Sequence, residues 1–409
     1  MFFQSKKIAV AVTGGIAAYK TCEIIRELKR AGAEVRVTTT ESAKRFVTDL
    51  TFAALSENPV AGSLFDENEL AGIAHVDLAR WGDVLLVCPA TANLIGKVAA
   101  GLADDIVSTT IMATKAPVVF CPAMNSAMWE NAIVQSNVEK LRTSGYELVE
   151  PEWGALATSS EGEGWGRLAT SARIIQKLKQ VLLGSTELKG HKVLVTAGAT
   201  REPIDPVRFI TNHSSGKMGF ALAEAAKLKG AEVVLISGRN QLQPLEGVKY
   251  IEVSTVEEMQ SAVFKEYKHA EILLMAAAVS DFRPKSRSSS KIKKSELDFT
   301  MELEKTPDIL AELGKKKTNC IHVGFALETD NGLNNATQKL HAKNLDMVVL
   351  NDPLEPGAGF VSDTNVVTLI SADGAIEKLP KLAKLTIATL ILERVLKIKQ
   401  FKNKQAAAV

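Results

Sequence analysis

The chain has 409 residues, which is too long for one typical domain core and predicts two domains of about 200 residues each. Charged residues make up 23% and apolar residues 46% of the sequence, as expected for a soluble globular protein. The net charge of +2 gives no reason to expect binding to nucleic acid or to a membrane, and no apolar run reaches the ~18 residues that a membrane-spanning helix needs.

The N-terminus and the cysteines both indicate a cytoplasmic protein. The start, MFFQSKKIAVAVTGG, places lysines before an apolar run that is too short for the core of a signal peptide. The cysteines at positions 22, 88, 121 and 320 are scattered, without CxxC or zinc spacing, and they lie in apolar helix-like or strand-like runs. We therefore expect them to be small buried hydrophobic residues.

Short apolar and β-branched runs alternate with helical patterns through most of the chain. Continuous apolar strands joined by helices favour parallel, doubly wound sheets, so we predict an α/β protein with two Rossmann-like domains. The expected strands are residues 7–13, 34–40, 83–91 and 116–124 in the first half, and 192–200, 231–238, 271–279, 320–328 and 346–352 in the second.

A polar stretch, TELKGH, follows a predicted helix at 172–185 and precedes the strand that restarts the pattern. We therefore place the first domain at 1–188 and the second at 189–398. The remaining residues, 399–409, are basic and low in complexity, which predicts a flexible tail.

Ligands of open α/β sheets bind beyond the carboxyl ends of the strands, so the loops at those ends are the candidate sites. After the first strand, TGGIAAYK places Gly14 and Gly15 before a helix, where backbone N–H groups can meet a phosphate, although a tight turn also favours glycine. CPATANLIGKVAAGLADD adds hydroxyl and amide side chains suited to a phosphate or a planar ring. The glycine-rich stretch 154–167, GALATSSEGEGWGR, fits no standard phosphate-binding pattern and predicts a flap that closes over a ligand.

His75, the motif PAMNSAMW (122–129) and the flap together resemble the flavin-dependent cysteine decarboxylases, specifically the phosphopantothenoylcysteine decarboxylases, over residues 1 to about 180. A lone histidine is more often structural, but the combination is specific. The resemblance implies FMN as the cofactor, catalytic roles for His75 and Asn125, and an active site between subunits of a trimer. The positions that the resemblance implies for cofactor contacts are Gly14, Gly15, Ile16, Thr39, Thr91, Asn93, Met124 and Met128.

The chemistry explains these residue types. A carboxylate with a β-thiol cannot lose CO₂ directly because nothing stabilises the carbanion, whereas oxidation of the thiol-bearing carbon by a flavin creates an electron sink. His75 can act as a base near neutral pH, and Asn125 can hydrogen-bond the carboxylate before it leaves.

The flap departs from the resembled family at Thr158, where a cysteine commonly protonates the reduced intermediate. A thiol has a pKa near ~8.5, and with water at about 15.7 as a stand-in, an alcohol is a weaker acid by ~7 units. Thr158 therefore cannot replace the thiol directly, and we expect the proton to come through water held by Thr158, Ser159 or Ser160. The alternative is a domain that decarboxylates but stalls before reduction.

Two stretches of the second half carry candidate phosphate contacts. NHSSGKMG (212–219) has residue types typical of a phosphate-binding loop but lacks the GxxxxGK[ST] spacing. RPKSRSSSKIKK (283–294) holds six cations in twelve residues, which is typical of a solvated loop or a nucleic-acid patch. Because this basic run follows a strand end, AAAVSD, we favour a triphosphate ligand over an extended polymer.

Residues from about 191 to 395 resemble phosphopantothenate–cysteine ligases at TREPIDPVRFITNHSSGKMGFA, AAAVSDFRPK, KIKK, KTPDIL, VGFALET and KNLDMVVLND. The resemblance implies that the carboxylate of 4′-phosphopantothenate attacks the α-phosphate of CTP, and that the amine of cysteine then displaces CMP from the acyl-cytidylate. Mg²⁺ and lysines would neutralise the phosphate charge. No metal-ligand residue is assigned.

The resemblance also implies roles for individual residues. Arg208, Asn212 and Ala278 would serve the acyl intermediate, although Asn212 also suits a simple turn, and Lys291 would stabilise charge at the transferred phosphorus. Lys339 and Lys343, four positions apart on a predicted helix, are otherwise ordinary solvated lysines. The implied nucleotide contacts are Met275, Ala276, Ala277, Asp281, Lys291, Pro307, Asp308, Ile309, Leu310, Phe325, Lys339 and Lys343.

Both resemblances together predict a bifunctional enzyme of coenzyme A biosynthesis, in which the second domain makes phosphopantothenoylcysteine and the first decarboxylates it to 4′-phosphopantetheine. They imply a homo-oligomer of decarboxylase trimers linked by ligase dimers. One alternative is an active ligase fused to a flavin-binding scaffold or regulator with impaired decarboxylation. Another is a nicotinamide dehydrogenase, which the lack of GxGxxG with an acidic residue ~20 positions later disfavours.

Overall fold

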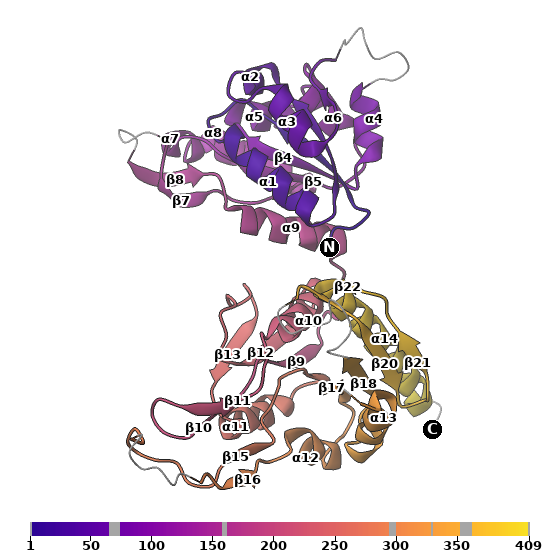
Figure 1. The fold of residues 1–409 in the computed structure, drawn as a ribbon. Helices are drawn as coiled ribbons and strands as arrows, with labels where there is room; N and C mark the ends of the chain where they lie inside the picture. Colours follow the sequence, from indigo (N-terminus) through magenta and orange to yellow (C-terminus); the bar gives the residue numbers. More distant parts are fainter. Residues whose placement is uncertain are drawn as a thin grey trace. The chain divides into compact units, whose positions relative to one another are not determined.

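The computed structural model describes residues 2–64, 74–157, 162–293, 300–328, 330–351 and 362–407, with side chains described to residue 402. The chain divides into two compact units, Met1–Gly184 and Ser185–Val409, each with its own core (Figure 1). The division falls a few residues before the predicted domain boundary.

The N-terminal unit is built on a six-stranded parallel sheet with the order β3-β2-β1-β4-β5-β6. The strands are β1 (Lys7–Val12), β2 (Glu34–Thr39), β3 (Val60–Ala61), β4 (Val84–Ala90), β5 (Val118–Pro122) and β6 (Glu147–Leu148). The helices are α1 (Ala18–Arg30), α2 (Glu41–Lys44), α3 (Asp49–Ser56), α4 (Ala74–Trp81), α5 (Ala92–Ala99), α6 (Ile106–Ala113), α7 (Ser126–Trp129), α8 (Ala132–Thr143) and α9 (Ser171–Leu183).

Helices cover both faces of this sheet, which is why its strands are continuous apolar runs. Ile8, Val10 and Val12 of β1 join the core that contains the buried residues of α1 and α9. Ala9 and Ala11 point the opposite way and join the core that contains those of α5 and α6. With both faces filled, a ligand can reach the sheet only at the strand ends.

The C-terminal unit has an eight-stranded sheet with the order β13-β12-β9-β14-β17-β18-β20-β21. The strands are β9 (Lys192–Ala197), β12 (Glu232–Gly238), β13 (Lys249–Val253), β14 (Ile272–Met275), β17 (Ile321–Leu327), β18 (Met347–Asn351), β20 (Val367–Ser371) and β21 (Ile376–Lys378). The helices are α10 (Lys217–Leu228), α11 (Val256–Tyr267), α12 (Ile309–Lys315), α13 (Gly332–Ala342) and α14 (Lys384–Ala407).

The predicted doubly wound α/β fold is confirmed, with one addition at the edge of the second sheet. Its strands are parallel from β13 to β18, whereas β20 and β21 are antiparallel. The sequence analysis does not predict these two strands because they are short and have no helix between them. A tight turn at Gly374, with a φ of 89°, joins them directly.

Four short antiparallel ribbons lie outside the main sheets and carry much of the candidate site chemistry. They are β7 (Glu152–Ala155) with β8 (Glu163–Arg167), β10 (Arg201–Pro203) with β11 (Phe209–Thr211), β15 (Phe282–Pro284) with β16 (Leu303–Lys305), and β19 (Thr364–Asn365) with β22 (Leu382–Ala383).

The flexible tail predicted at 399–409 is wrong over most of its length, because α14 continues to Ala407. Lys399 forms an ion pair with Glu271, and Lys402 Nζ lies 2.5 Å from Asp346 Oδ1. Two of the lysines that suggested a solvated tail, Lys399 and Lys402, are therefore paired with carboxylates. No helix within the described residues is both long and apolar enough to cross a membrane.

Candidate functional sites

The turn between β1 and α1 is a backbone cradle of the kind that accepts a phosphate. A Cβ added at Gly14 would lie only 2.4 Å from Ser42 Cβ, so the turn has no space for a side chain there. Ala17, at the N-cap of α1, makes no side-chain cap hydrogen bond, and the turn is closed by Gly15 N, which donates to Thr13 O at 3.0 Å, and by Ala18 N, which donates to Gly15 O at 2.9 Å. Ile16 beside it is 57% exposed.

Thr13 ties the ends of β1 and β4 together, where the strand order changes direction. Its hydroxyl donates to Pro89 O at 2.7 Å and accepts from Thr91 N at 3.1 Å. Thr91 in turn caps α5 by accepting from Leu94 N. This junction between β1 and β4 is the place where open α/β sheets bind cofactors.

Two residues of the predicted flavin set differ in their surroundings. Asn93 is exposed on the first turn of α5, beside the β4 end. Thr39 is fully buried, and its hydroxyl donates to Asp49 Oδ1 at 2.8 Å. Thr39 therefore anchors α3 to the end of β2 instead of presenting its hydroxyl to a ligand.

The flap and the PAMNSAMW motif form one assembly. Met124 N donates to Gly166 O at 3.0 Å, and a Cβ at Gly166 would lie 2.1 Å from Met124 O. A Cβ at Gly164 would meet Ser126 Oγ at 2.6 Å. Only glycines in β8 allow this close approach, which explains the composition of the flap.

Asn125 and His75 both present polar atoms near these strand ends. Asn125 is the N-cap of α7, where its Oδ1 accepts from Ala127 N at 2.9 Å. His75 lies in the first turn of α4, and its buried Nδ1 has no hydrogen-bond partner among the described residues. A buried ring nitrogen without a partner suits a group that meets a ligand. Thr158, Ser159 and Ser160 lie outside the described residues.

Exposed apolar side chains surround this assembly. Met128 on α7 is 47% exposed, and Trp153 and Trp165 of the β7–β8 ribbon pack edge to face, with ring centroids 6.0 Å apart, while remaining about half exposed. An apolar surface of this kind beside candidate catalytic residues is typical of a surface that another molecule covers.

A cavity of about 540 Å³ opens in the C-terminal unit at the carboxyl ends of β14, β17 and β18. Most of the ligase residues predicted from the sequence line it, although they come from separate loops. Those residues are Asn212, Met275, Ala276, Ala277, Ala278, Asp281, Pro307, Asp308, Ile309, Leu310, Phe325, Lys339 and Lys343.

Lys339 and Lys343 are tied to the wall of this cavity and are not free in solvent. Lys339 Nζ donates to Phe325 O at 2.7 Å, and Lys343 Nζ lies 2.8 Å from Asp308 Oδ2. Burial and the nearby Lys343 charge lower the pKa of Lys339. Burial raises the pKa of Asp308, but Lys343 and the Ala311 amide outweigh it and hold that pKa below its usual value. Lys339 and Lys343 therefore lie where an anionic ligand in the cavity would contact them.

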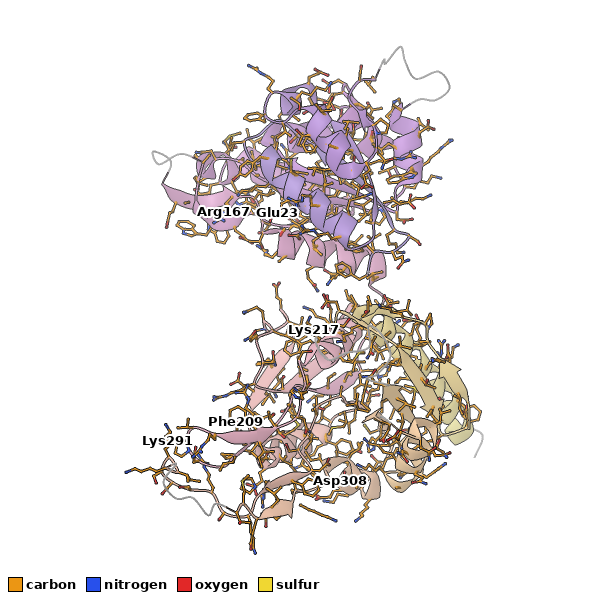
Figure 2. All side chains as sticks on the ribbon, viewed as in Figure 1. Glu23, Arg167, Phe209, Lys217, Lys291 and Asp308 are labelled. Atoms are coloured by element: carbon orange, nitrogen blue, oxygen red, sulfur yellow. The ribbon has the colours of Figure 1, made fainter. Side chains whose placement is uncertain are left out.

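Arg208 and Lys291 do not line the cavity. Arg208 donates from Nε to Asp205 Oδ2 at 2.9 Å and from Nη2 to Ile292 O at 2.9 Å, which ties the loop that carries Lys291 to the β10–β11 ribbon. Arg208 is the main reason that the pKa of the buried Asp205 lies far below its usual value. Figure 2 shows Lys291 beside Phe209 at the outer end of the ribbons, well away from Asp308.

The cavity also contains polar residues that the sequence analysis did not predict as site residues. These are His213, Ser214, Ser215, Lys217, Ser280, Thr306, Asn351, Asn365 and Lys384. Lys217 lies in the stretch NHSSGKMG, whose resemblance to a phosphate-binding loop was the available signal. Lys384 has no local signal, because it enters the site only through the packing of α14.

Comparison with known proteins assigns the class and then the family. Residues 3–183 match the family model described as flavoprotein, and residues 188–398 match the model described as DNA/pantothenate metabolism flavoprotein C-terminal domain. The chain is therefore a fusion of a flavoprotein unit and a pantothenate-metabolism unit.

Relatives of nearly equal length make the assignment specific. The coenzyme A biosynthesis bifunctional protein CoaBC of Bacillus subtilis (strain 168) is 45% identical over 394 residues, covering 96% of this chain and 97% of that protein. The protein of the same description from Escherichia coli (strain K12) is 41% identical, covering 99% of this chain and 100% of that one. A solved C-terminal domain of such a protein is 41% identical with a TM-score of 0.46, covering 53% of this chain and 99% of that domain. The chain belongs to the family of bifunctional coenzyme A biosynthesis enzymes.

Proposed function

We propose that this enzyme carries out two consecutive reactions of coenzyme A biosynthesis. The C-terminal unit joins 4′-phosphopantothenate to cysteine at the expense of CTP, and the N-terminal unit decarboxylates the product to 4′-phosphopantetheine with FMN. The observation that carries the proposal is the convergence on one cavity of thirteen residues predicted from ligase-like motifs. Membership of the family supports the same pair of reactions.

In the C-terminal unit, the cavity supplies the groups that acyl-nucleotide chemistry requires. Asp281 gives one carboxylate for Mg²⁺, whose remaining ligands would be phosphate oxygens and water, in keeping with the few protein ligands that this ion usually takes. Within the described residues no cluster of three or more metal-ligating side chains occurs, which suits a metal carried by the nucleotide. Lys339 and Lys343 add positive charge.

Asn212, at the rim of the cavity, donates from Nδ2 to Val279 O at 3.1 Å. This hydrogen bond orients the amide between the strand end of β14 and the N-terminus of α10, where the carboxylate of the acyl substrate would enter. We assign Asn212 to positioning of the acyl intermediate during attack by the amine of cysteine.

In the N-terminal unit, the Gly14–Gly15 turn and the β1–β4 junction fit the phosphate and the ring of FMN. When bound, the flavin supplies two-electron oxidation of the thiol-bearing carbon. His75 would take up a proton at its buried, unpartnered Nδ1 or transfer it through that ring, and Asn125 would hold the substrate carboxylate. The β7–β8 flap would exclude water from the site.

We also propose a cytoplasmic homo-oligomer with decarboxylase trimers and ligase dimers. The exposed tryptophans of the β7–β8 ribbon support a covered surface at the first site. Arg208 and Lys291 lie on ribbons outside the cavity of their own chain, which supports their action at the cavity of a second copy.

The test is an assay of the full chain with 4′-phosphopantothenate, cysteine, CTP, Mg²⁺ and FMN that follows pyrophosphate and CO₂ separately. We expect stoichiometric release of both and a final product with the mass of 4′-phosphopantetheine. Pyrophosphate without CO₂ would refute the decarboxylase assignment, whereas the absence of both products would refute the ligase assignment, because the decarboxylase would then receive no substrate.

The proton donor in the flap is tested by supplying phosphopantothenoylcysteine directly and determining the mass of the product by mass spectrometry. Complete reduction to 4′-phosphopantetheine supports proton delivery by water held at Thr158, Ser159 or Ser160. An accumulating aminoenethiol would show that the N-terminal unit decarboxylates but stalls before reduction.

A further inference from the structure

Three strands line the cavity of the C-terminal unit with residues that have no role in the chemistry described above. These residues are Asn351 of β18, Asn365 of β19 and Val367 of β20. The nucleotide contacts that the resemblance implies come from β14 and the loop after it, the start of α12, β17 and α13. The three strands are therefore available to the other large substrate.

Asn351 is held in register from both sides at the carboxyl end of β18, which lies between β17 and β20 in the sheet (Figure 1). It pairs with Leu327 of β17 and with Val367 of β20, and its carbonyl oxygen accepts from Glu328 N at 3.4 Å. A functional side chain on a strand is placed more precisely than one on a loop. The sheet therefore fixes where the Asn351 carboxamide meets the cavity.

The carboxamide oxygen of Asn351 is buried without a hydrogen bond. Its Oδ1 is shielded from solvent and has no hydrogen-bond partner among the described residues. An unpaired buried acceptor is destabilising and uncommon, so it calls for a functional explanation. A hydrogen-bond donor that entered the cavity would supply the missing partner.

The surroundings of Asn351 are apolar and uncharged on these strands. Leu327 and Val367, its neighbours in register, also line the cavity. Asn365 is 5% exposed, and its Oδ1 accepts from Val366 N at 2.9 Å. The charged residues that line the cavity come from the helices, their caps and the loop after β14. A neutral ligand segment with both methyl and hydrogen-bonding groups suits this surface.

We propose that Asn351 recognises the uncharged middle of phosphopantothenate, with its Oδ1 accepting a hydrogen bond from the hydroxyl or the amide N–H of that chain. Between its phosphate and its carboxylate, this substrate carries one hydroxyl, one amide and two methyl groups. The polar groups match the carboxamide, and the methyl groups match the Leu327 and Val367 side chains. The inference rests on the proposed ligase reaction and assigns a specificity-determining residue for its acyl substrate.

The test compares Asn351→Ala with Asn319→Ala in the full, FMN-loaded chain. Asn319 is exposed and lies just before β17, at the opposite ends of the strands, so its substitution removes the same group outside the cavity. From pyrophosphate release, we expect Asn351→Ala to raise the KM for phosphopantothenate about tenfold, as for the loss of one hydrogen bond. The KM values for CTP and cysteine should stay within twofold, as should all three values in Asn319→Ala.

A nucleotide also carries donors, in its ribose hydroxyls and its cytosine amine, so the kinetics must separate the two substrates. A KM that rises for CTP and not for phosphopantothenate would assign Asn351 to the nucleotide and would overturn the proposal. Constants within twofold of the unmodified enzyme for both substrates would overturn it as well.

Two substrate analogues give a readout that a purely structural role of Asn351 would not change. One analogue replaces the free hydroxyl of phosphopantothenate by hydrogen, and the other replaces its amide nitrogen by an ester oxygen. The unmodified enzyme should use the analogue that lacks the paired group about tenfold less well than phosphopantothenate. Asn351→Ala should use that analogue and phosphopantothenate equally well, because the hydrogen bond is already lost. Equal discrimination by the two proteins on both analogues would refute the role of Asn351.

Two further measurements separate this inference from other failures. The melting temperature reports whether Asn351→Ala is folded, and Asn351→Leu, which keeps the branched shape of the side chain, replaces it if it melts early. Isothermal titration with phosphopantothenate measures binding without turnover. If Asn351→Ala binds about tenfold more weakly but the unmodified enzyme releases no pyrophosphate from CTP, the proposed ligase reaction fails while the recognition by Asn351 stands.

Discussion

Gly166 shows how one residue decides whether the flap of the N-terminal unit can reach its site. Its φ of 134° is open to glycine, and its Cα approaches the Met124 carbonyl so closely that a Cβ would lie 2.1 Å from that oxygen. Neither restraint can be relieved by a side-chain rotation, because the group in the way is backbone.

We predict that Gly166→Ala displaces β8 from the PAMNSAMW motif. CO₂ release from phosphopantothenoylcysteine should fall at least tenfold, and the N-terminal unit should lose about 1–3 kcal/mol of stability. Gly96→Ala is the matched control, because a Cβ there would meet only Asn137 Nδ2 at an ordinary 3.7 Å. Equal CO₂ release by the two variants would contradict the role given to Gly166.

At the scale of elements, the β10–β11 ribbon holds the loop that carries Lys291. Asp205 is the centre of this contact, because it accepts from Val207 N and Arg208 N at 2.8 Å each and from Ile292 N at 3.3 Å. Its charge also holds the Arg208 guanidinium, which reaches Ile292 O.

We predict that Asp205→Asn loosens the Lys291 loop and lowers the rate of pyrophosphate release about tenfold, since removing one partner of a hydrogen-bonded charge pair leaves the other without it. CO₂ release from supplied phosphopantothenoylcysteine should not change. Asp373→Asn, in the exposed turn between β20 and β21, alters a carboxylate that accepts from Ala375 N within its own turn, far from the Lys291 loop in the chain, and should leave both rates unaltered.

Helix α14 contacts the amino-terminal ends of the strands in the second sheet through Asp346, which directly precedes β18. This residue is 4% exposed; its Oδ1 meets Lys402 at 2.5 Å, and its Oδ2 meets Lys317 at 2.8 Å and the backbone N–H of His322 at 2.7 Å. Burial raises the pKa of Asp346, but the two lysines outweigh it and hold that pKa below its usual value. Stability from this carboxylate is therefore present at neutral pH and is lost as the pH falls through its folded-state pKa.

Lys402→Ala is expected to lower the stability of the C-terminal unit by roughly 1 kcal/mol, because Lys402 is partly exposed and Lys317 remains to pair with Asp346. The deficit should shrink in acid, where Asp346 is protonated in both proteins. Lys397→Ala, on an exposed position of the same helix, is the control. Chemical denaturation at pH 7 and at a pH well below 3.8, the ordinary pKa of an aspartate, measures both, and a deficit that persists unchanged at the lower pH would argue against the ion pair as its cause.

At the scale of the whole molecule, the chain joins two sheets that each bury their own core and present separate strand-end sites. The relatives that match this chain over nearly its full length are described as bifunctional proteins of coenzyme A biosynthesis. Both units contain a parallel sheet with helices on its faces. The residues at the carboxyl ends of the strands differ: they are glycines and a half-buried histidine in the N-terminal unit, and lysines with carboxylates in the C-terminal unit.

Sequence patterns by themselves determined the fold class and the positions of the main strands, and the resemblance of short motifs to a known family indicated thirteen of the residues that line the ligase cavity. The apolar runs of buried strands and the short motifs at strand ends each lie within one segment of the chain, so each can be recognised without knowledge of the rest of the fold. That is why Met275 to Ala278, Asp281 and Pro307 to Leu310 were identified from the resemblance of their motifs before their contacts were known.

Only the tertiary structure decided how distant segments meet. It buried the Thr39 hydroxyl against Asp49, separated Arg208 and Lys291 from the cavity, turned the basic tail into a docked helix and brought Lys384 beside Lys217. The physical reason is that the burial and the charge of a side chain depend on neighbours in other elements of the fold, which for Lys399 and Glu271 are 128 residues apart in the chain. The spacing of residues along the sequence does not predict which lysine will be desolvated by burial and which will stay hydrated.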